Sequence, residues 1–355
     1  MNARRIRLAR FVVAAAATLL ALSAGEWIAR RLDAAPPIVR PTQFSDVLSS
    51  RHRIRFEELF VADDDRFWKL APSSALPPDR LPLFGVIANA AGLREDHEVP
   101  RRKPAGETRI LFLGDSTTFG YRVALGQTFV EQTEELLRQR HPDRAFECIN
   151  AGVPGYTLFQ GWRFLQTAGW DYAPDLVVLN FGWNDAESWD ATGDEETWRR
   201  RAAALPPRGL RGLRLARLLW RAVAPRPEPV HVTSRPRLFP YEFRTLLDRI
   251  AAAAQDRGCA VLVLVGPGRS NLAWTATREH RAPLQEQQSA FGRRLRFAGG
   301  EGVLDLVPVF QQLADLHPAD DLLFDSVHPT PLGHRSIAES VVRRLDPWLT
   351  AGDGR

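Results

Sequence analysis

The chain has 355 residues, of which 45% are hydrophobic and 25% charged, a balance typical of one large globular domain with an appendage. The formal net charge is +5, and the arginines that dominate the basic residues gather at the N-terminus and between Arg199 and Arg235. No nucleic-acid-binding motif accompanies them, so this composition argues against a nucleic-acid partner and favours local contact with anionic surfaces.

Residues 1–29 have the layout of a signal peptide or signal-anchor, because arginines at positions 4, 5, 7 and 10 precede the apolar run FVVAAAATLLALSAG. This run is shorter than the roughly 20 residues that span a bilayer, unless the segment from Glu26 to Ala29 joins it, with Trp27 at the interface. Cleavage near residues 21–24 would release a secreted protein, whereas the polar residues from Glu26 onward favour an uncleaved anchor. The arginine-rich first flank predicts a cytoplasmic N-terminus and a periplasmic or cell-surface body.

Residues 30–106 are rich in Pro, Arg and Asp and show no sustained helix or strand period. We expect an extended spacer that packs partly on the domain behind it. The Pro and charge cluster over residues 95–107 marks the boundary of that domain.

From residue 107 to 350 the pattern alternates between strands and helices. Strands are expected at 109–113, 145–152, 175–182, 260–266 and 302–310, and helices at 128–141, 158–168, 241–257, 279–297 and 331–345. Such alternation predicts an α/β fold, a three-layer α/β/α sandwich with a mainly parallel five-stranded sheet.

An insertion covers residues 186–240. Within it, the stretch RGLRGLRLARLLWRAV over residues 208–223 spaces five arginines three or four apart, with leucines, Trp220 and Val223 between them. This spacing predicts a basic amphipathic helix, which would lie on an anionic membrane, cover a pocket or pack on its own domain.

Four short polar segments lie at or just beyond the expected strand ends. They are GDST at 114–117, NAGVPGYT at 150–157, FGWND at 181–185 and DSVHP at 325–329. Open α/β sheets bind ligands at the carboxyl ends of their strands, so the four segments can converge on one cleft. Ser116 is then either a nucleophile, with its own N–H free for an oxyanion, or a helix N-cap.

Asp325 and His328 are three residues apart and can meet within one turn, so that the carboxylate fixes the imidazole tautomer while the ring deprotonates Ser116. The G-x-S-x-G elbow of α/β-hydrolases is absent, because Thr118 occupies its last position. His334 is the competing histidine, and we expect it to face solvent on the last helix.

All four segments, in this order, resemble the SGNH or GDSL hydrolases, and the resemblance covers residues 109–345. It implies an SGNH-type serine esterase with the flatter SGNH sheet, in strand order 2-1-3-4-5, and a catalytic triad of Ser116, Asp325 and His328. The oxyanion hole would consist of the Ser116 N–H, Gly155 and Asn184, with Gly152 left to form the turn. No metal or other cofactor is implied, and substrates of the family range from lipids to acetylated glycans.

Export favours a cell-envelope substrate such as O-acetylated polysaccharide. Tryptophans at positions 162, 170, 183 and 189 lie near the expected cleft, where they would stack on sugars or pack in the core. Two alternatives remain open: an acyltransferase that passes the acyl group to a polysaccharide hydroxyl, and a non-catalytic surface binding module.

The two cysteines, Cys148 and Cys259, lie in apolar runs and form no C-x-x-C motif. In strand order 2-1-3-4-5 two strands separate them, at about 4.8 Å per strand. Their Cα atoms would exceed the roughly 7 Å limit for a bridge, so we expect two free thiols.

Overall fold

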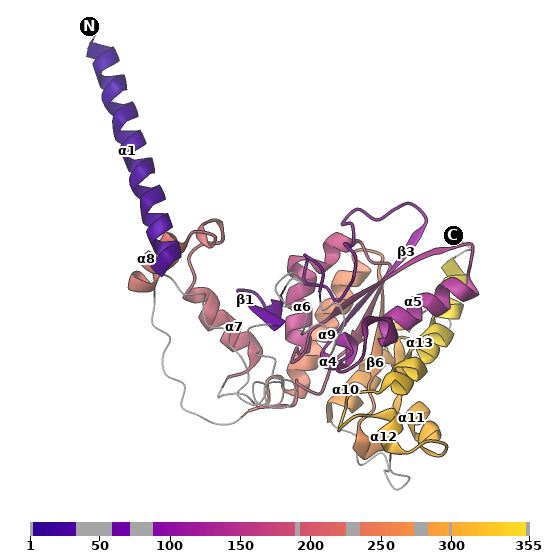
Figure 1. The fold of residues 1–355 in the computed structure, drawn as a ribbon. Coiled ribbons are helices and arrows are strands. Elements are labelled where there is room, and N and C mark those ends of the chain that lie inside the picture. Colours follow the sequence, from indigo (N-terminus) through magenta and orange to yellow (C-terminus); the bar gives the residue numbers. More distant parts are fainter. Residues whose placement is uncertain are drawn as a thin grey trace.

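The computed structural model describes residues 3–32, 59–71, 88–188, 192–224, 235–272, 283–297 and 300–352. Its centre is a parallel five-stranded sheet in the order β4-β3-β5-β6-β9. The strands are β3 (Glu107–Gly114), β4 (Ala145–Gly152), β5 (Leu176–Asn180), β6 (Ala260–Val265) and β9 (Val303–Asp305). In chain order this is 2-1-3-4-5, which confirms the predicted topology (Figure 1).

The central strands are apolar on both faces because each face has its own hydrophobic core. In β3, Leu111 and Leu113 belong to one core, whereas Ile110 and Phe112 belong to the other. Alternate side chains of a strand point to opposite faces, so two covered faces produce the uninterrupted apolar run ILFL. Cys148 on β4 and Cys259 just before β6 are buried, free thiols, as predicted.

Helices cover both faces of the sheet (Figure 1). One layer packs around α5 (Phe129–Arg140), α11 (Val307–Ala314) and α13 (Pro331–Gly352), which contribute to the core of Ile110. The other contains α6 (Leu158–Thr167), α9 (Pro240–Gln255) and α10 (Pro283–Gly292), which contribute to the core of Leu111. The three-layer α/β/α sandwich is therefore confirmed.

The strand predicted at 302–310 and the helix predicted at 279–297 both end earlier than expected. The expected strand at 302–310 ends at Asp305, since Pro308 lies in the first turn of α11 and the Asp305 carboxylate accepts the N–H of Val307 at 3.1 Å. The expected helix at 279–297 stops at Gly292, and a short hairpin of β7 (Arg296–Phe297) and β8 (Gly300–Glu301) follows.

A short antiparallel hairpin, absent from the prediction, lies within the expected spacer. It consists of β1 (Phe60–Asp63) and β2 (Phe67–Leu70). Trp68 is fully buried, its Nε1 donates to the Pro154 carbonyl at 3.2 Å, and its own carbonyl accepts the Tyr156 hydroxyl at 2.5 Å. These contacts attach the hairpin to the loop that follows β4.

The N-terminal helix α1 (Ala3–Leu32) projects away from the sheet (Figure 1). The segment Arg10–Arg31 is long and apolar enough to cross a membrane, and its most apolar 18-residue window is not buried in the described structure. A signal sequence has the same properties. Ala29, near the end of the segment, is buried.

The predicted basic helix at 208–223 is shorter than expected. A turn of 3-10 helix, η5 (Arg208–Leu210), precedes α8 (Arg214–Val223), and α7 (Asp194–Ala203) lies upstream. Figure 1 shows α8 beside the end of α1 and far from α4 (Ser116–Phe119), the short helix that begins at Ser116. The placement does not support the alternative that this helix covers the site.

Candidate active site

Ser116 is the first residue of α4, at the carboxyl end of β3. Asp115 is the N-cap, because its Oδ1 accepts the backbone N–H and the hydroxyl of Thr117, both at 2.8 Å. The helix therefore has a cap other than Ser116, whose hydroxyl is left for another partner. The turn is tight enough that a Cβ on Gly114 would lie 2.0 Å from Thr118 Oγ1.

Ser116, His328 and Asp325 form a continuous hydrogen-bonded chain. His328 Nε2 lies 2.8 Å from Ser116 Oγ, and His328 Nδ1 lies 2.9 Å from both carboxylate oxygens of Asp325. The structure thus brings together all three residues that the sequence predicts as a triad, across 212 positions of chain. The Tyr121 ring packs against the imidazole, with 4.7 Å between ring centroids.

Asp325 is held in its ionised form. Its partial burial raises the pKa, but the hydrogen bond and charge of His328 outweigh that effect and lower the pKa below its usual value. Oδ1 of Asp325 also accepts the backbone N–H groups of Val327 and His328, which closes the turn of the DSVHP segment. An ionised carboxylate in this place stabilises an imidazolium at His328.

Asn184 contacts Asp115, the residue before Ser116. Its Nδ2 donates to Asp115 Oδ2 at 3.1 Å, so the cap of α4 also positions the amide. An amide nitrogen carries two protons, and this contact uses one of them. Burial raises the pKa of the Asp115 carboxyl, against the opposing hydrogen bonds of Thr117.

Asp185 joins the loop of Asn184 to the loop of Gly155. Its carboxylate accepts the backbone N–H of Leu158 at 2.8 Å and that of Gly182 at 2.9 Å. The group is fully buried, and this burial raises its pKa to about 7. One side chain of the FGWND segment therefore holds the first residue of α6, which directly follows the NAGVPGYT segment.

Gly152 and Gly155 have different roles. Gly152 ends β4 directly against α4, since a Cβ there would lie 2.3 Å from the Phe119 backbone nitrogen. Gly155 has φ +78°, a left-handed conformation that favours glycine. Gly152 thus permits a close approach of strand and helix, and it is Gly155 that forms the turn, contrary to the assignment from sequence.

Arg237 holds the Gly155 loop through a hydrogen bond to its backbone. No feature of the sequence indicated this role for Arg237. This buried guanidinium donates to the Gly155 carbonyl at 2.6 Å and to both Asp194 carboxylate oxygens at 2.8 and 3.0 Å. Thr157 donates its hydroxyl to the same carboxylate at 2.6 Å. Among the described residues, the N–H groups of Ser116 and Gly155 donate to no protein acceptor.

His334 is buried, so the prediction that it faces solvent was wrong. Its Nδ1 accepts the N–H of Phe129 at 3.1 Å, and its ring stacks on the Phe129 ring at 5.9 Å. Burial, together with the charges of Arg94 and His328, lowers its pKa to about 3. His334 therefore caps the first turn of α5 as a neutral ring and has no contact with Ser116.

Replacing His334 with phenylalanine should lower stability at pH 7 by about 1–3 kcal/mol, because the Phe129 N–H loses its acceptor. The free energy of unfolding of the variant should also depend less on pH than that of the wild type. In the native protein the His334 pKa is about 3, below the usual 6.5, so the unfolded chain binds more protons between these values. Stability from this histidine is present above pH 6.5 and lost as the pH falls toward 3. Urea unfolding across this window checks the effect, and parallel wild-type and variant curves would contradict it.

Three of the four predicted tryptophans lie in the described residues, and their surroundings differ. Trp162 and Trp170 pack against the hydrophobic core, and Trp189 lies outside the described residues. Trp183 is next to Gly268, where a Cβ would lie 2.6 Å from the indole and 3.4 Å from the Ser326 carbonyl. Trp183 is thus the tryptophan placed beside the loop of Asp325 and His328.

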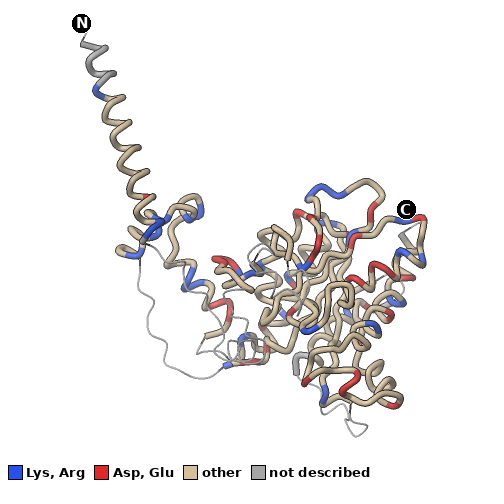
Figure 2. Tube along the Cα trace, viewed as in Figure 1, with Lys and Arg blue, Asp and Glu red and all other residues tan. Residues whose placement is uncertain are grey.

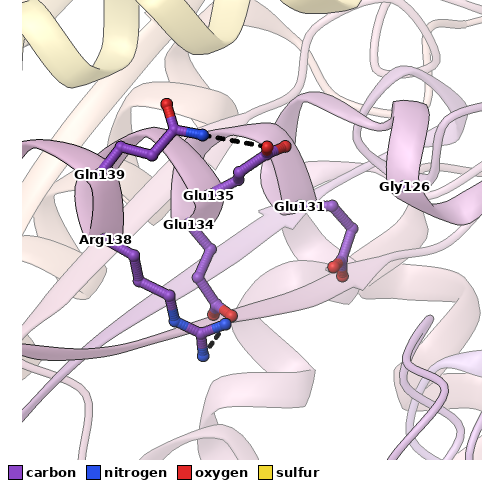
Figure 3. Close-up of a pocket in the computed structure, with 6 residues that line it drawn as sticks. All are labelled: Gly126, Glu131, Glu134, Glu135, Arg138 and Gln139. Atoms are coloured by element: carbon purple, nitrogen blue, oxygen red, sulfur yellow. Dashed lines mark hydrogen bonds and ion pairs between the residues drawn. The ribbon is translucent and has the colours of Figure 1, made fainter.

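A hollow of about 380 Å³ lies on the outer side of α5 and contains no residue of the site just described (Figure 3). Its lining consists of Gly126, Glu131, Glu134, Glu135, Arg138 and Gln139. Burial, with the charge of Glu134 nearby, raises the pKa of Glu131 to about 7. The hollow is separate from the convergent loops at Ser116.

Comparison with known proteins identifies the matching family. Residues 112–336, more than half of the chain, match the model of the GDSL-like Lipase/Acylhydrolase family. A search of curated proteins gives no significant match.

Solved structures with a similar fold include an acetylxylan esterase, Axe2 from Geobacillus stearothermophilus. It is 16% identical with a TM-score of 0.47, over 67% of this chain and 94% of that one. Another is LAE5, an alpha/beta hydrolase enzyme from the metagenome of Lake Arreo, Spain. It is 17% identical with a TM-score of 0.46, over 67% and 94% of the two chains.

Proposed function

The chain belongs to the GDSL-like lipase/acylhydrolase family, and on that premise we propose that it hydrolyses esters through an acyl intermediate on Ser116. The observation that carries the proposal is the chain of hydrogen bonds from Ser116 Oγ through His328 to Asp325. A serine hydroxyl is a weak nucleophile until a neighbouring base removes its proton, and His328 Nε2 is 2.8 Å away.

In the acylation step, Ser116 Oγ attacks the carbonyl carbon of the ester while His328 takes the hydroxyl proton. When the tetrahedral intermediate collapses, the bond to the alcohol breaks and His328 returns the proton to the departing oxygen. In the second step His328 deprotonates a water molecule, which attacks the acyl-serine. When this second intermediate collapses, the bond to Ser116 Oγ breaks, His328 returns the proton to that oxygen, and the acid is released. Asp325 keeps Nδ1 of His328 protonated throughout and stabilises the transient imidazolium.

The oxyanion of each intermediate would be held by the N–H groups of Ser116 and Gly155 and by the second proton of Asn184 Nδ2. Two features support this role. The first turn of a helix leaves its N–H groups without helical partners, and Asp115 fixes the Asn184 amide at 3.1 Å. Asp185 and Arg237 would be positioning residues, since they hold the Asn184 and Gly155 loops.

We place the catalytic domain outside the cytoplasm, tethered by α1, with residues 4–10 on the cytoplasmic side, and assign it an ester substrate of the cell envelope such as O-acetylated glycan. The exposed apolar window within Arg10–Arg31 supports the tether, and the flanking arginines support the orientation. The partly exposed Trp183 beside Gly268 would provide a surface for a sugar ring.

The purified full chain should hydrolyse small acyl esters, and Ser116→Ala should remove this activity without loss of helical content. Ser188→Ala, at an exposed serine, is the matched control and should retain it. Activity of Ser116→Ala equal to that of the control would refute the proposal.

Addition of an acetylated or free saccharide, with analysis of the products, separates hydrolysis from acyl transfer.

A further inference from the structure

The helix α8 is built onto the end of α1 rather than onto the sheet. Both carboxylate oxygens of Glu26 accept N–H groups from its first turn: Oε1 that of Arg214 at 3.0 Å and Oε2 that of Leu215 at 2.9 Å. Arg30 donates to the same carboxylate at 2.8 Å. A negative side chain from α1 therefore caps the positive N-terminus of α8.

The two helices also pack closely. A Cβ on Gly25 would lie 3.0 Å from Leu215 Cδ2, so the absence of a side chain at Gly25 allows the approach. On its other side, α8 is attached to the catalytic domain through Arg217, which donates to Asp64 in the β1–β2 turn at 3.0 Å. The helix thus connects the apolar N-terminal helix to the domain that carries Ser116.

The arginines and the exposed apolar side chains of α8 lie on different faces. Arg214, Arg217 and Arg221 follow at intervals of three and four and share one face. Leu219 and Val223, four apart on another face, are 63% and 74% exposed, and the preceding Leu213 is 44% exposed. Within the described part of the chain nothing covers these apolar side chains.

The position of α8 indicates what covers this face. Its cap, Glu26, follows the run of small and apolar residues in α1 and lies five residues before the end of the candidate span Arg10–Arg31, close to where a membrane-crossing helix would leave the hydrocarbon. Figure 2 shows Lys and Arg gathered at this junction of α1 and α8. An amphipathic helix with apolar side chains on one face and arginines on another matches the boundary between acyl chains and anionic headgroups.

We propose that α8 lies in the surface of the leaflet from which α1 emerges toward the catalytic domain. Leu219 and Val223 enter the acyl boundary, and Arg214 and Arg221 contact anionic headgroups, whereas Arg217 stays paired with Asp64. With Glu26 as cap and the Arg217–Asp64 pair as tie, this contact sets the height and orientation of the catalytic domain above the bilayer. The inference rests on the proposed membrane tether α1, and it is independent of the proposed chemistry at Ser116.

The test uses the full chain, reconstituted into phosphatidylcholine vesicles with and without phosphatidylglycerol. A polarity-sensitive fluorophore is attached to Leu219→Cys, and Leu316→Cys is the matched control, because Leu316 is a 78% exposed leucine near α11. Unsubstituted protein supplies the blank, since Cys148 and Cys259 are buried. Lipids that carry a quencher near the headgroup report contact with the bilayer.

We expect the label at 219 to shift to shorter emission wavelength and to be quenched at least twofold more than the label at 316, with stronger quenching when phosphatidylglycerol is present. Glu26→Ala should reduce that quenching while α1 remains inserted. Equal quenching at 219 and 316 would overturn the proposal. So would a wavelength shift at 219 without quenching by lipid, which would indicate contact with a second copy of the chain.

Discussion

Replacing His328 with alanine is expected to lower kcat for ester hydrolysis by about 10⁴- to 10⁶-fold. The imidazole is the group within 2.8 Å of Ser116 Oγ that can accept its proton, and the variant leaves the serine without a base. Asp325→Asn retains the ring but loses the carboxylate that fixes its tautomer, and should cost about 10⁴-fold.

His317→Ala is the matched control for the histidine, because this partly exposed side chain follows α11 and belongs to none of the four motif segments. Steady-state kinetics on one soluble ester, with circular dichroism as the check on folding, decide the outcome. A loss below tenfold in a folded His328→Ala protein would exclude this histidine as the base.

Gly152→Ala is expected to destabilise the protein by about 3 kcal/mol and to reduce activity with it. The added Cβ would lie 2.3 Å from Phe119 N and 2.7 Å from Thr118 C, both backbone atoms, so relief requires a shift of β4 against α4. Because α4 begins at Ser116, that shift would move the Ser116 hydroxyl away from His328 Nε2.

Gly126→Ala provides the matched comparison, since a Cβ at that position meets nothing within 4 Å. The midpoints of urea unfolding should differ clearly between the two variants, with Gly126→Ala near the wild type. Equal midpoints would show that β4 and α4 are not packed as closely as described.

The sequence predicted the sheet well because its signal is local. A strand such as β3 is covered on both faces, so its buried residues form a consecutive apolar run that ends at Gly114. The end of β9 was missed because the apolar residues after Asp305 continue in α11, and the proline at 308 was the available sign of a helix start.

The burial of His334 could have been predicted from the helical period. Ile337, Ala338 and Val341 are all buried, and they follow His334 at three, four and seven positions, on one face of α13. Its partner, the Phe129 N–H, is 205 residues away in sequence, so no local pattern reveals what the ring does there.

The residues that support the site could not be predicted either, because their partners are also distant in sequence. Arg237 meets the Gly155 carbonyl across 82 residues, and Trp68 meets the Pro154 carbonyl across 86. Neither residue belongs to a motif, and both act on the Gly155 loop through contacts that exist only in the fold. The motif segments identify reacting groups, whereas the residues that position them are defined by tertiary packing.

The most direct test of the account is covalent labelling of the wild-type protein with a fluorophosphonate, followed by mass spectrometry of its peptides. The hydroxyl that His328 activates should displace fluoride and form a single adduct on Ser116. An unmodified Ser116 in folded protein, or an adduct at another serine with Ser116 unlabelled, would contradict the assignment of the nucleophile.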